Sequence, residues 1–311
     1  MTPVPPYPLI NAVDLIRALP KARTFEIGNF LFARFTCPAQ EEPIGIWAES
    51  DHLIHVLTAK ATWETFSGTC SARAGETIFF RKGAYIAPPH TDENLCLLLF
   101  FLPDAIVRET VRELAPTLPH RSTTFESREM ALRINHDVGL TSFLHAMTEY
   151  FSGEETPPEP LLKLKLKELV TSILVGPSNP ILAEYFRSLA VFQAPPLDWV
   201  LETNFQHNLS VAQFAQLCHR SVSSFKREFR ARYHTTPGKW LLDRRLACAA
   251  SLLLTTRLSV TEIMLECAFE DLSHFSRAFK ERFGRSPTEY RITGDPIQSL
   301  PPSHDSASFS A

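Results

Sequence analysis

Two short runs near the C-terminus carry basic and hydroxyl side chains at helical spacing. Lysine, arginine and serine side chains donate hydrogen bonds to phosphates and to base edges in a DNA major groove. The candidates for base contact are, in the first run, Ser223, Lys226, Arg227 and Arg230 and, in the second, Ser276 and Arg277. The chemistry that these residue types indicate is therefore recognition of a nucleic acid.

Further basic side chains flank the two runs. The candidates for contact with the DNA backbone are Arg220, Lys239, Lys280, Arg282 and Arg285, although any of them also fits an ordinary solvated surface. The whole chain has 31 basic and 34 acidic residues, but residues 198–292 hold 14 basic and 10 acidic ones. Because attraction to phosphate is local and screened by salt, this net positive region is where we expect a nucleic acid to bind.

The elements that must position these side chains occur twice. The run Leu209–Val211 followed by Phe225–Phe229 is repeated as Leu258–Val260 followed by Phe275–Phe279, offset by 49 and then 50 residues. A serine precedes the first short helix of each copy and is a good N-cap residue. The aromatic residues of the second helix are four apart, so they share one face and predict a buried underside. Each copy is therefore predicted to be a helix-turn-helix.

A longer helix is predicted between the copies. It begins at Pro237, a favoured first helical residue, continues to about Leu254, and ends at Thr255 and Thr256. About 18 residues at roughly 1.5 Å each give a length of roughly 27 Å. Such a helix can hold two recognition helices about one DNA turn, roughly 34 Å, apart. A single chain would then read two adjacent major grooves without a dimer.

The order and spacing of these motifs resemble the AraC/XylS family of bacterial transcription regulators over residues 198–292. The second copy shows this most fully, in the runs Ala268–Glu270, Ser273–Lys280 and Phe283–Arg291. The resemblance implies a C-terminal all-α module of two helix-turn-helix motifs joined by a long helix. It also implies a sequence-specific DNA-binding regulator, an activator rather than a repressor. Its base-reading positions include the candidates above and, in the second copy, Leu272 and Ser273.

Two positions qualify this resemblance. Arg277 has a second interpretation, because an arginine at this place can brace the second helix-turn-helix instead of contacting DNA. Ala268 stands where the family often has glycine, and a left-handed backbone there would be strained for alanine. Acidic residues near the second turn, Glu266, Glu270 and Asp271, are candidates for contact with a basic surface of RNA polymerase.

Residues 24–102 have the pattern of a β-rich domain. Short β-branched or aromatic segments alternate with turn residues, which is typical of a small β-sandwich or barrel. The run Gly75–Gly83 resembles the turn, strand and turn of cupin-like domains. The predicted chain is therefore an α+β, multidomain protein. Its parts are an N-terminal regulatory and dimerisation domain over 1–192 (β-barrel about 24–102, helices about 103–192), a linker at 193–197, the DNA-binding module at 198–292 and a disordered tail at 293–311.

One predicted helix, Leu161 to Leu174, carries a continuous apolar stripe made of Leu162, Leu166, Leu169 and Ile173. The stripe is either an intramolecular core or a surface for a homodimer, since helices in this region mediate dimerisation in relatives. This stretch and the strand pattern are similar to the family branch that contains activators of type III secretion genes. In that branch the N-terminal domain can respond to a regulatory protein instead of a small molecule.

Two other functions are open from the residues alone. In the first, the β-domain is chiefly a sensor that binds a sugar or an aromatic compound. Its pocket would be lined by aromatic residues that otherwise belong to the core, namely Trp47, Trp63, Phe66, Phe79, Phe80 and Tyr85.

In the second alternative, the β-domain is a cupin-type metal enzyme. However, His52 and His55 are three apart and so point to opposite faces of a strand, while His90 and Glu76 lie elsewhere. We find no catalytic constellation, so no enzyme activity, metal or cofactor is expected.

The cellular setting is expected to be the cytoplasm. The longest apolar run, Leu95 to Leu102, is eight residues and is too short to span a membrane. The N-terminus has no basic region before an apolar stretch. The six cysteines are scattered without a C-x-x-C pair, which is typical of reduced thiols.

Overall fold

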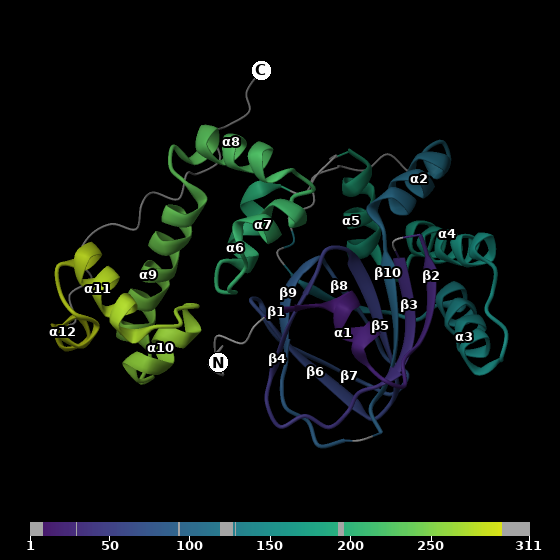
Figure 1. Cartoon of the computed structure of the whole chain (residues 1–311). Coiled ribbons are helices and arrows are strands. Elements are labelled where there is room, and N and C mark those ends of the chain that lie inside the picture. The colour runs from purple at the N-terminus through teal and green to yellow at the C-terminus, as the bar shows by residue number, and fades with distance from the viewer. Residues whose placement is uncertain are drawn as a thin grey trace. The chain divides into compact units, whose positions relative to one another are not determined.

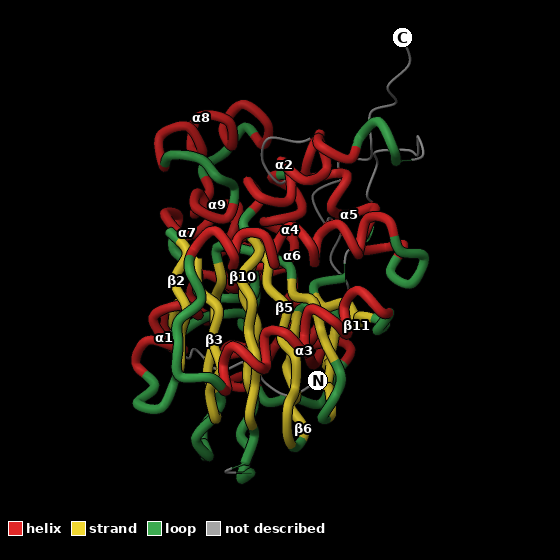
Figure 2. The backbone as a smooth tube through the Cα atoms, turned by 90° about the vertical axis from the view of Figure 1, so that its right-hand side faces the viewer, coloured by secondary structure: helices red, strands yellow, loops and turns green. Residues whose placement is uncertain are grey.

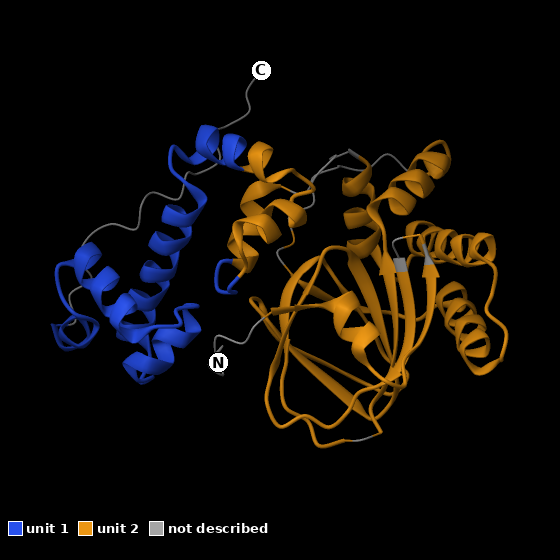
Figure 3. Cartoon of the chain, viewed as in Figure 1, with its two compact units in different colours: residues 1–7, 205–208, 226–311 blue, residues 8–204, 209–225 orange. Residues whose placement is uncertain are grey.

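The computed structural model describes residues 9–28, 30–92, 94–118, 127, 129–191 and 196–293 (Figure 1). These residues form two compact units (Figure 3). Of the described residues, the larger unit contains those within 9–204 and 209–225, and the smaller unit contains 205–208 and 226–293. The predicted domain boundary was 193–197, whereas here residues 198–204 and 209–225 group with the N-terminal part. Residues 193–195 and the predicted disordered tail from 294 lie outside the described residues.

The larger unit contains two β-sheets, as the predicted sandwich requires. The first has the order β1 (Leu9–Asn11), β4 (Ile44–Ala48), β9 (Gly83–Ala87), β6 (Lys60–Thr65) and β7 (Gly68–Arg73). The second has the order β11 (Ala131–Ile134), β8 (Thr77–Phe80), β5 (Asp51–Thr58), β10 (Cys96–Leu102), β3 (Phe30–Thr36) and β2 (Arg23–Ile27). Apart from the parallel pair β1 and β4, the paired strands are antiparallel.

Strand β10 explains why the second sheet is apolar on both faces. Alternate side chains of a strand point to opposite faces. Leu97, Leu99 and Phe101 belong to one hydrophobic core, shared with the first sheet. Leu98 and Phe100 belong to another, shared with four helices. The longest apolar run of the sequence is therefore a central strand between two cores.

The helices of the second core are α2 (Asp104–Leu114), α3 (Val138–Ser152), α4 (Glu159–Val175) and α5 (Pro180–Val191). They lie within the stretch of about 103–192 that was predicted to be helical, and Figure 2 shows α3 and α4 against the β3, β10 and β5 face of the sheet. Their apolar side chains meet those of β10, for example Phe143 against Phe100 with ring centroids 5.1 Å apart. These helices therefore cover the sheet face that would otherwise expose half of β10.

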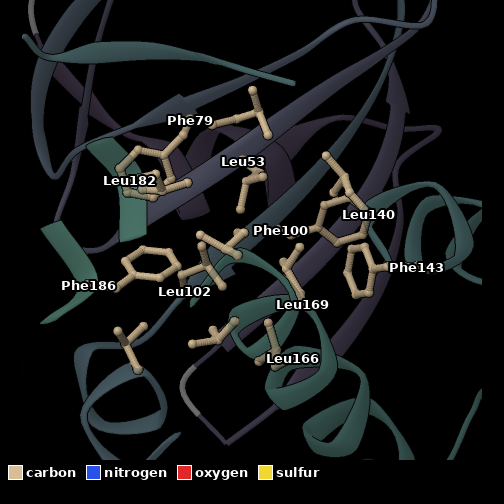
Figure 4. Close-up of a cluster of buried hydrophobic side chains, with 14 of the residues drawn as sticks. Leu53, Phe79, Phe100, Leu102, Leu140, Phe143, Leu166, Leu169, Leu182 and Phe186 are labelled. Carbon is tan, nitrogen blue, oxygen red and sulfur yellow. The ribbon is translucent and has the colours of Figure 1, made fainter. Parts of the chain in front are cut away.

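The apolar stripe of α4 belongs to this core (Figure 4). Its members Leu162, Leu166, Leu169 and Ile173 are between 0% and 2% exposed. The structure thus corrects their interpretation as a dimer surface, because the fold of the single chain already buries them. Leu164, on the other side of the helix, is 61% exposed.

Several elements of the larger unit were absent from the sequence prediction. They are β1, β7, β11 and α1 (Ala12–Ala18). Strand β7 reads Gly-Thr-Cys-Ser-Ala-Arg, and it lies at a sheet edge. Small polar residues on an edge strand carry little hydrophobic pattern, so pairing with β6 defines this strand, not its own sequence.

The smaller unit is helical. It contains α9 (Pro237–Thr255), α10 (Val260–Glu266), α11 (Leu272–Phe283) and α12 (Pro287–Thr293). Their shared core includes Leu246, Ile263, Phe275, Phe279 and Tyr290. The long helix α9 extends over 19 residues, so it is about 28 Å long, close to the predicted length.

Three findings bear on the function classes. No helix among the described residues has the length and apolar character needed to cross a membrane. Within the same part of the chain, no three His, Cys, Asp or Glu side chains gather as metal ligands would. All six cysteines are free thiols.

Candidate nucleic-acid interface

The first helix of each repeat begins as the serine pattern predicts. Helix α7 (Val211–Leu217) is capped by Ser210, and α10 by Ser259. In both cases the serine hydroxyl accepts from the third residue of the helix, and the side chain of that residue accepts from the serine backbone N–H. These two capping boxes satisfy backbone donors that would otherwise lack partners. They also fix the starting point of each motif.

The turn of each repeat contains a left-handed residue. His219 has a φ of 52° and Ala268, at the equivalent place, has a φ of 57°. Further along, His234 and Gly284 also correspond, with φ values of 54° and 74°. The left-handed backbone at Ala268 costs roughly 1–2 kcal/mol for any residue with a Cβ. Alanine stands here where the family often has glycine, and the backbone is left-handed, so the fold bears this strain.

Helix α8 (Val222–Tyr233) presents the first set of candidates. Phe225 and Phe229 are fully buried, as their spacing predicts. The four candidate side chains, Ser223, Lys226, Arg227 and Arg230, are exposed. Lys226, Arg227 and Arg230 make no ion pair with the described part of the chain, so their charges face solvent.

Helix α11 presents the second set. Phe275 and Phe279 are buried, whereas Leu272, Ser273 and Arg277 are exposed. Ser276 is half-buried. Arg277 makes no hydrogen bond or ion pair with the described residues, so the bracing interpretation gains no support from the structure. Leu272, 44% exposed at the start of the helix, is an apolar group suited to contact with a thymine methyl.

The candidates for phosphate contact divide into two groups. Lys239 and Lys280 are exposed, and Arg220 and Arg285 are half-buried. Arg282 is different, because its Nη1 donates to Oδ1 of Asp243 at 2.5 Å, which joins α11 to α9. The charge of Arg282 is therefore already partly balanced within the protein.

Two arginines that the sequence interpretation missed hold this unit together. Arg245, on α9, donates through Nε and Nη2 to the backbone carbonyls of Phe205 and His207, each at 2.9 Å. Arg291, on α12, donates to the carbonyls of Leu253 and Leu258. Their partners are backbone oxygens distant in sequence. No local motif indicates such a role.

The acidic candidates for a polymerase contact also divide. Glu266 is 5% exposed, so it is not presented to a partner. Glu270 and Asp271 are exposed. Asp271 caps α11 by accepting from the backbone N–H of His274 at 2.5 Å, and Glu270 accepts from the side chain of Asn208.

The β-domain contains an apolar cavity of about 200 Å³. Its lining includes Phe35, Ile54, Trp63, Leu97 and Leu99. Of the six aromatic residues considered for a pocket, Trp63 and Tyr85 line the cavity, whereas Phe79 packs against the helices. The side-chain nitrogen of Gln40 donates to the carbonyls of Ala87 and Pro88 at the rim.

The two strand histidines do not converge. The Nε2 of His52 lies 3.1 Å from the hydroxyl of Tyr85, and the Nδ1 of His55 lies 2.9 Å from the hydroxyl of Thr77. Burial lowers the pKa of each imidazole to about 4, so both are neutral at pH 7. They are hydrogen-bonded interior side chains on separate faces, as the spacing predicted.

Known proteins match the N-terminal and C-terminal parts of the chain separately. Residues 214–292 match the family described as a helix-turn-helix domain, and residues 51–185 match the ExsA N-terminal regulatory domain. The virulence regulon transcriptional activator VirF of Yersinia enterocolitica is 24% identical over 243 residues, which cover 78% of this chain and 89% of VirF. The HTH-type transcriptional regulator ExsA of Pseudomonas aeruginosa is 23% identical, covering 76% of this chain and 84% of ExsA. A crystal structure of an apo ToxT variant from Vibrio cholerae is 14% identical with a TM-score of 0.41, covering 85% of this chain and 97% of that one.

Proposed function

Because the chain belongs to the AraC-type transcription regulators and carries an ExsA-type regulatory domain, we propose that it activates transcription by reading two successive major grooves of promoter DNA. The observation that carries the proposal is the repeated exposed face: Lys226 and Arg227 on α8, and Ser273 and Arg277 on α11. Both sets belong to the unit that contains α9, whose length is close to the separation of adjacent grooves. One chain supplies both faces, so reading two grooves needs no second copy.

In this proposal residues 198–292 are the DNA-binding domain, and the base contacts are those of the two exposed faces. The VirF relative is named as an activator of a virulence regulon, which supports a role at promoters of virulence genes, including those of type III secretion. Glu270 and Asp271 are the candidates for contact with RNA polymerase near α11. The ExsA-type domain receives the controlling signal, from a regulatory protein or from a small molecule.

The exposed lysines outside the base-reading positions should contribute mainly through phosphate. Lys239→Ala and Lys280→Ala should each weaken binding to all DNA sequences alike. Each should also reduce the slope of log affinity against log salt by about 1, since one fewer counterion is released. Affinity titrations between 50 and 200 mM salt, roughly the range over which phosphate contacts dominate, measure this slope. Lys163→Ala is the control, because Lys163 lies on α4 of the regulatory domain and pairs with Glu159. An unchanged slope in both test variants would remove them from the interface.

The cavity favours a second candidate function, binding of an apolar effector by the β-domain. A sugar needs several convergent polar groups, whereas this lining is mostly aliphatic and aromatic. The aromatic alternative is therefore better supported than the sugar. The cavity lies between the two sheets, among the side chains of the core that β10 shares with the first sheet, so a bound molecule would alter the packing of the regulatory domain directly.

Naphthalene and glucose distinguish these two ligand classes. Naphthalene should raise the free energy of unfolding of the full chain by about 2.7 kcal/mol at a concentration 100 times its Kd, and glucose should not. Thermal or urea unfolding with each compound measures the change. Ala61→Leu, which adds volume to the cavity lining, should abolish the response. Equal effects of the two compounds, or none from naphthalene, would contradict an apolar effector site.

A further inference from the structure

A buried ion pair of the regulatory domain reaches the turn of the first helix-turn-helix. The Nζ of Lys82 lies 2.7 Å from both carboxylate oxygens of Asp104. Lys82 is 1% exposed and Asp104 is 6% exposed. The same Nζ lies 2.9 Å from Nε2 of His219, and that Nε2 lies 3.3 Å from Oδ2 of Asp104. All three residues belong to the larger compact unit.

The chemistry of this contact is well defined. The Nε2 of His219 lies within hydrogen-bonding distance of both partners, an ammonium group that can only donate and a carboxylate that can only accept. Burial alone would raise the pKa of Asp104. The hydrogen bond from His219 and the charge of Lys82 outweigh that effect and hold the pKa well below its usual range. The carboxylate is therefore negatively charged directly beside the turn.

The contact is built into the regulatory domain. Asp51, fully buried, accepts from the backbone N–H of Lys82 and from the hydroxyl of Tyr185 on α5, each at 2.8 Å. The neighbouring Arg81 guanidinium lies 3.6 Å from the ring centroid of Trp199 on α6 (Leu197–Asn204). The backbone N–H of Ala84 donates to Oδ1 of Asn204, also on α6. A short segment, 81–84, thus holds both α6 and the turn that precedes α8.

The equivalent turn of the second repeat has a different residue type at this position. Ala268, the counterpart of His219, has the same left-handed backbone and a methyl group in place of the imidazole. The turn therefore does not require a histidine for its own conformation. At this position of the turn, only the first copy carries a side chain that can form hydrogen bonds.

The contact of the His219 turn with the regulatory domain is incompatible with DNA binding by the first helix-turn-helix. In a helix-turn-helix the N-terminal end of the recognition helix enters the major groove, and the preceding helix crosses the backbone. The turn between them therefore approaches phosphates. In this structure the turn contacts Lys82 and Asp104 of the regulatory domain, so the same side of the turn is not free to approach a phosphate. Binding to DNA and binding to Asp104 exclude one another.

We propose that the contact of His219 with Lys82 and Asp104 is an autoinhibitory latch, by which the regulatory domain withholds the first helix-turn-helix from DNA. This rests on the proposed function and adds the residues through which it is controlled. A partner or effector that rearranges the regulatory domain activates the protein by breaking the latch. The route from the signal runs through Asp51 and Tyr185, which connect Lys82 to the sheet and to α5.

Two substitutions at His219 test the latch without unfolding the regulatory domain. His219→Asn and His219→Gly both suit a left-handed backbone and remove the imidazole. Lys82 and Asp104 remain paired. Each variant of the full chain should bind a promoter fragment selected by the wild type roughly five- to tenfold more tightly. Fluorescence anisotropy of the labelled fragment measures the affinity, and thermal unfolding verifies the fold.

The matched control is His234→Asn. His234 is an exposed histidine with a φ of 54° that follows α8, and its substitution should leave affinity unchanged. The proposal requires tighter binding by both His219 variants and not by the control, and any other pattern overturns it. Failure of the wild type to select any fragment would instead contradict the DNA-binding function itself.

Discussion

Replacing Lys226 and Arg277 together with alanine should weaken specific DNA binding by about 2–6 kcal/mol. A lost contact to a base edge costs roughly 1–3 kcal/mol. The two residues lie on different helices, α8 and α11, with no shared partner, so their effects should add. Both side chains are exposed, and we therefore expect the free energy of unfolding to change by less than about 0.5 kcal/mol. Affinity for a selected promoter fragment and urea unfolding measure the two quantities.

The two single variants separate the contributions of α8 and α11. Lys226→Ala should relax sequence preference in one major groove and Arg277→Ala in the adjacent one, because each side chain reads its own groove. Arg257→Ala is the matched control, since Arg257 is an exposed cation between α9 and α10 outside both faces. Wild-type affinity in the double variant would remove α8 and α11 as the reading helices.

The repeat was predictable from the sequence because its signals are local. Ser210 and Ser259 cap helices through backbone groups three residues away, and Phe275 and Phe279 share a face through helical geometry alone. The same reasoning located α9 and α4 to within a few residues. Such features depend on neighbours in the chain, which a sequence shows directly.

The features that the sequence did not reveal depend on partners far along the chain. The stripe of α4 reads equally well as a dimer surface until the sheet that covers it is known. Arg282 looks like a solvated cation until α9 brings Asp243 to it. Strand β7 and the role of Arg245 likewise arise from tertiary pairing.

The contact made by His219 shows this limit most clearly. A histidine in a polar turn carries no signal for a buried lysine 137 positions earlier. Only the folded regulatory domain brings Lys82 and Asp104 to that turn. His219 and Ala268 share a left-handed backbone conformation. The backbone of the turn therefore does not explain why the first copy has a histidine.

Spacing of the DNA contacts tests the central claim, that one chain reads two successive major grooves as a fixed pair. Inserting five base pairs between the two mapped half-sites of a selected fragment turns one half-site by about half a helical turn. Because α9 is a continuous helix about 28 Å long, the second motif cannot follow this rotation. Affinity should fall at least about a hundredfold, as expected when several base contacts of roughly 1–3 kcal/mol are lost.

A ten-base-pair insertion restores the face of the duplex but moves the half-site about 34 Å further away, so it should not restore binding. The decisive measurement is the affinity of the full chain for the original, five-base-pair and ten-base-pair fragments under one salt condition. The account predicts tight binding to the original fragment alone. Undiminished binding to the fragment with the five-base-pair insertion would contradict it.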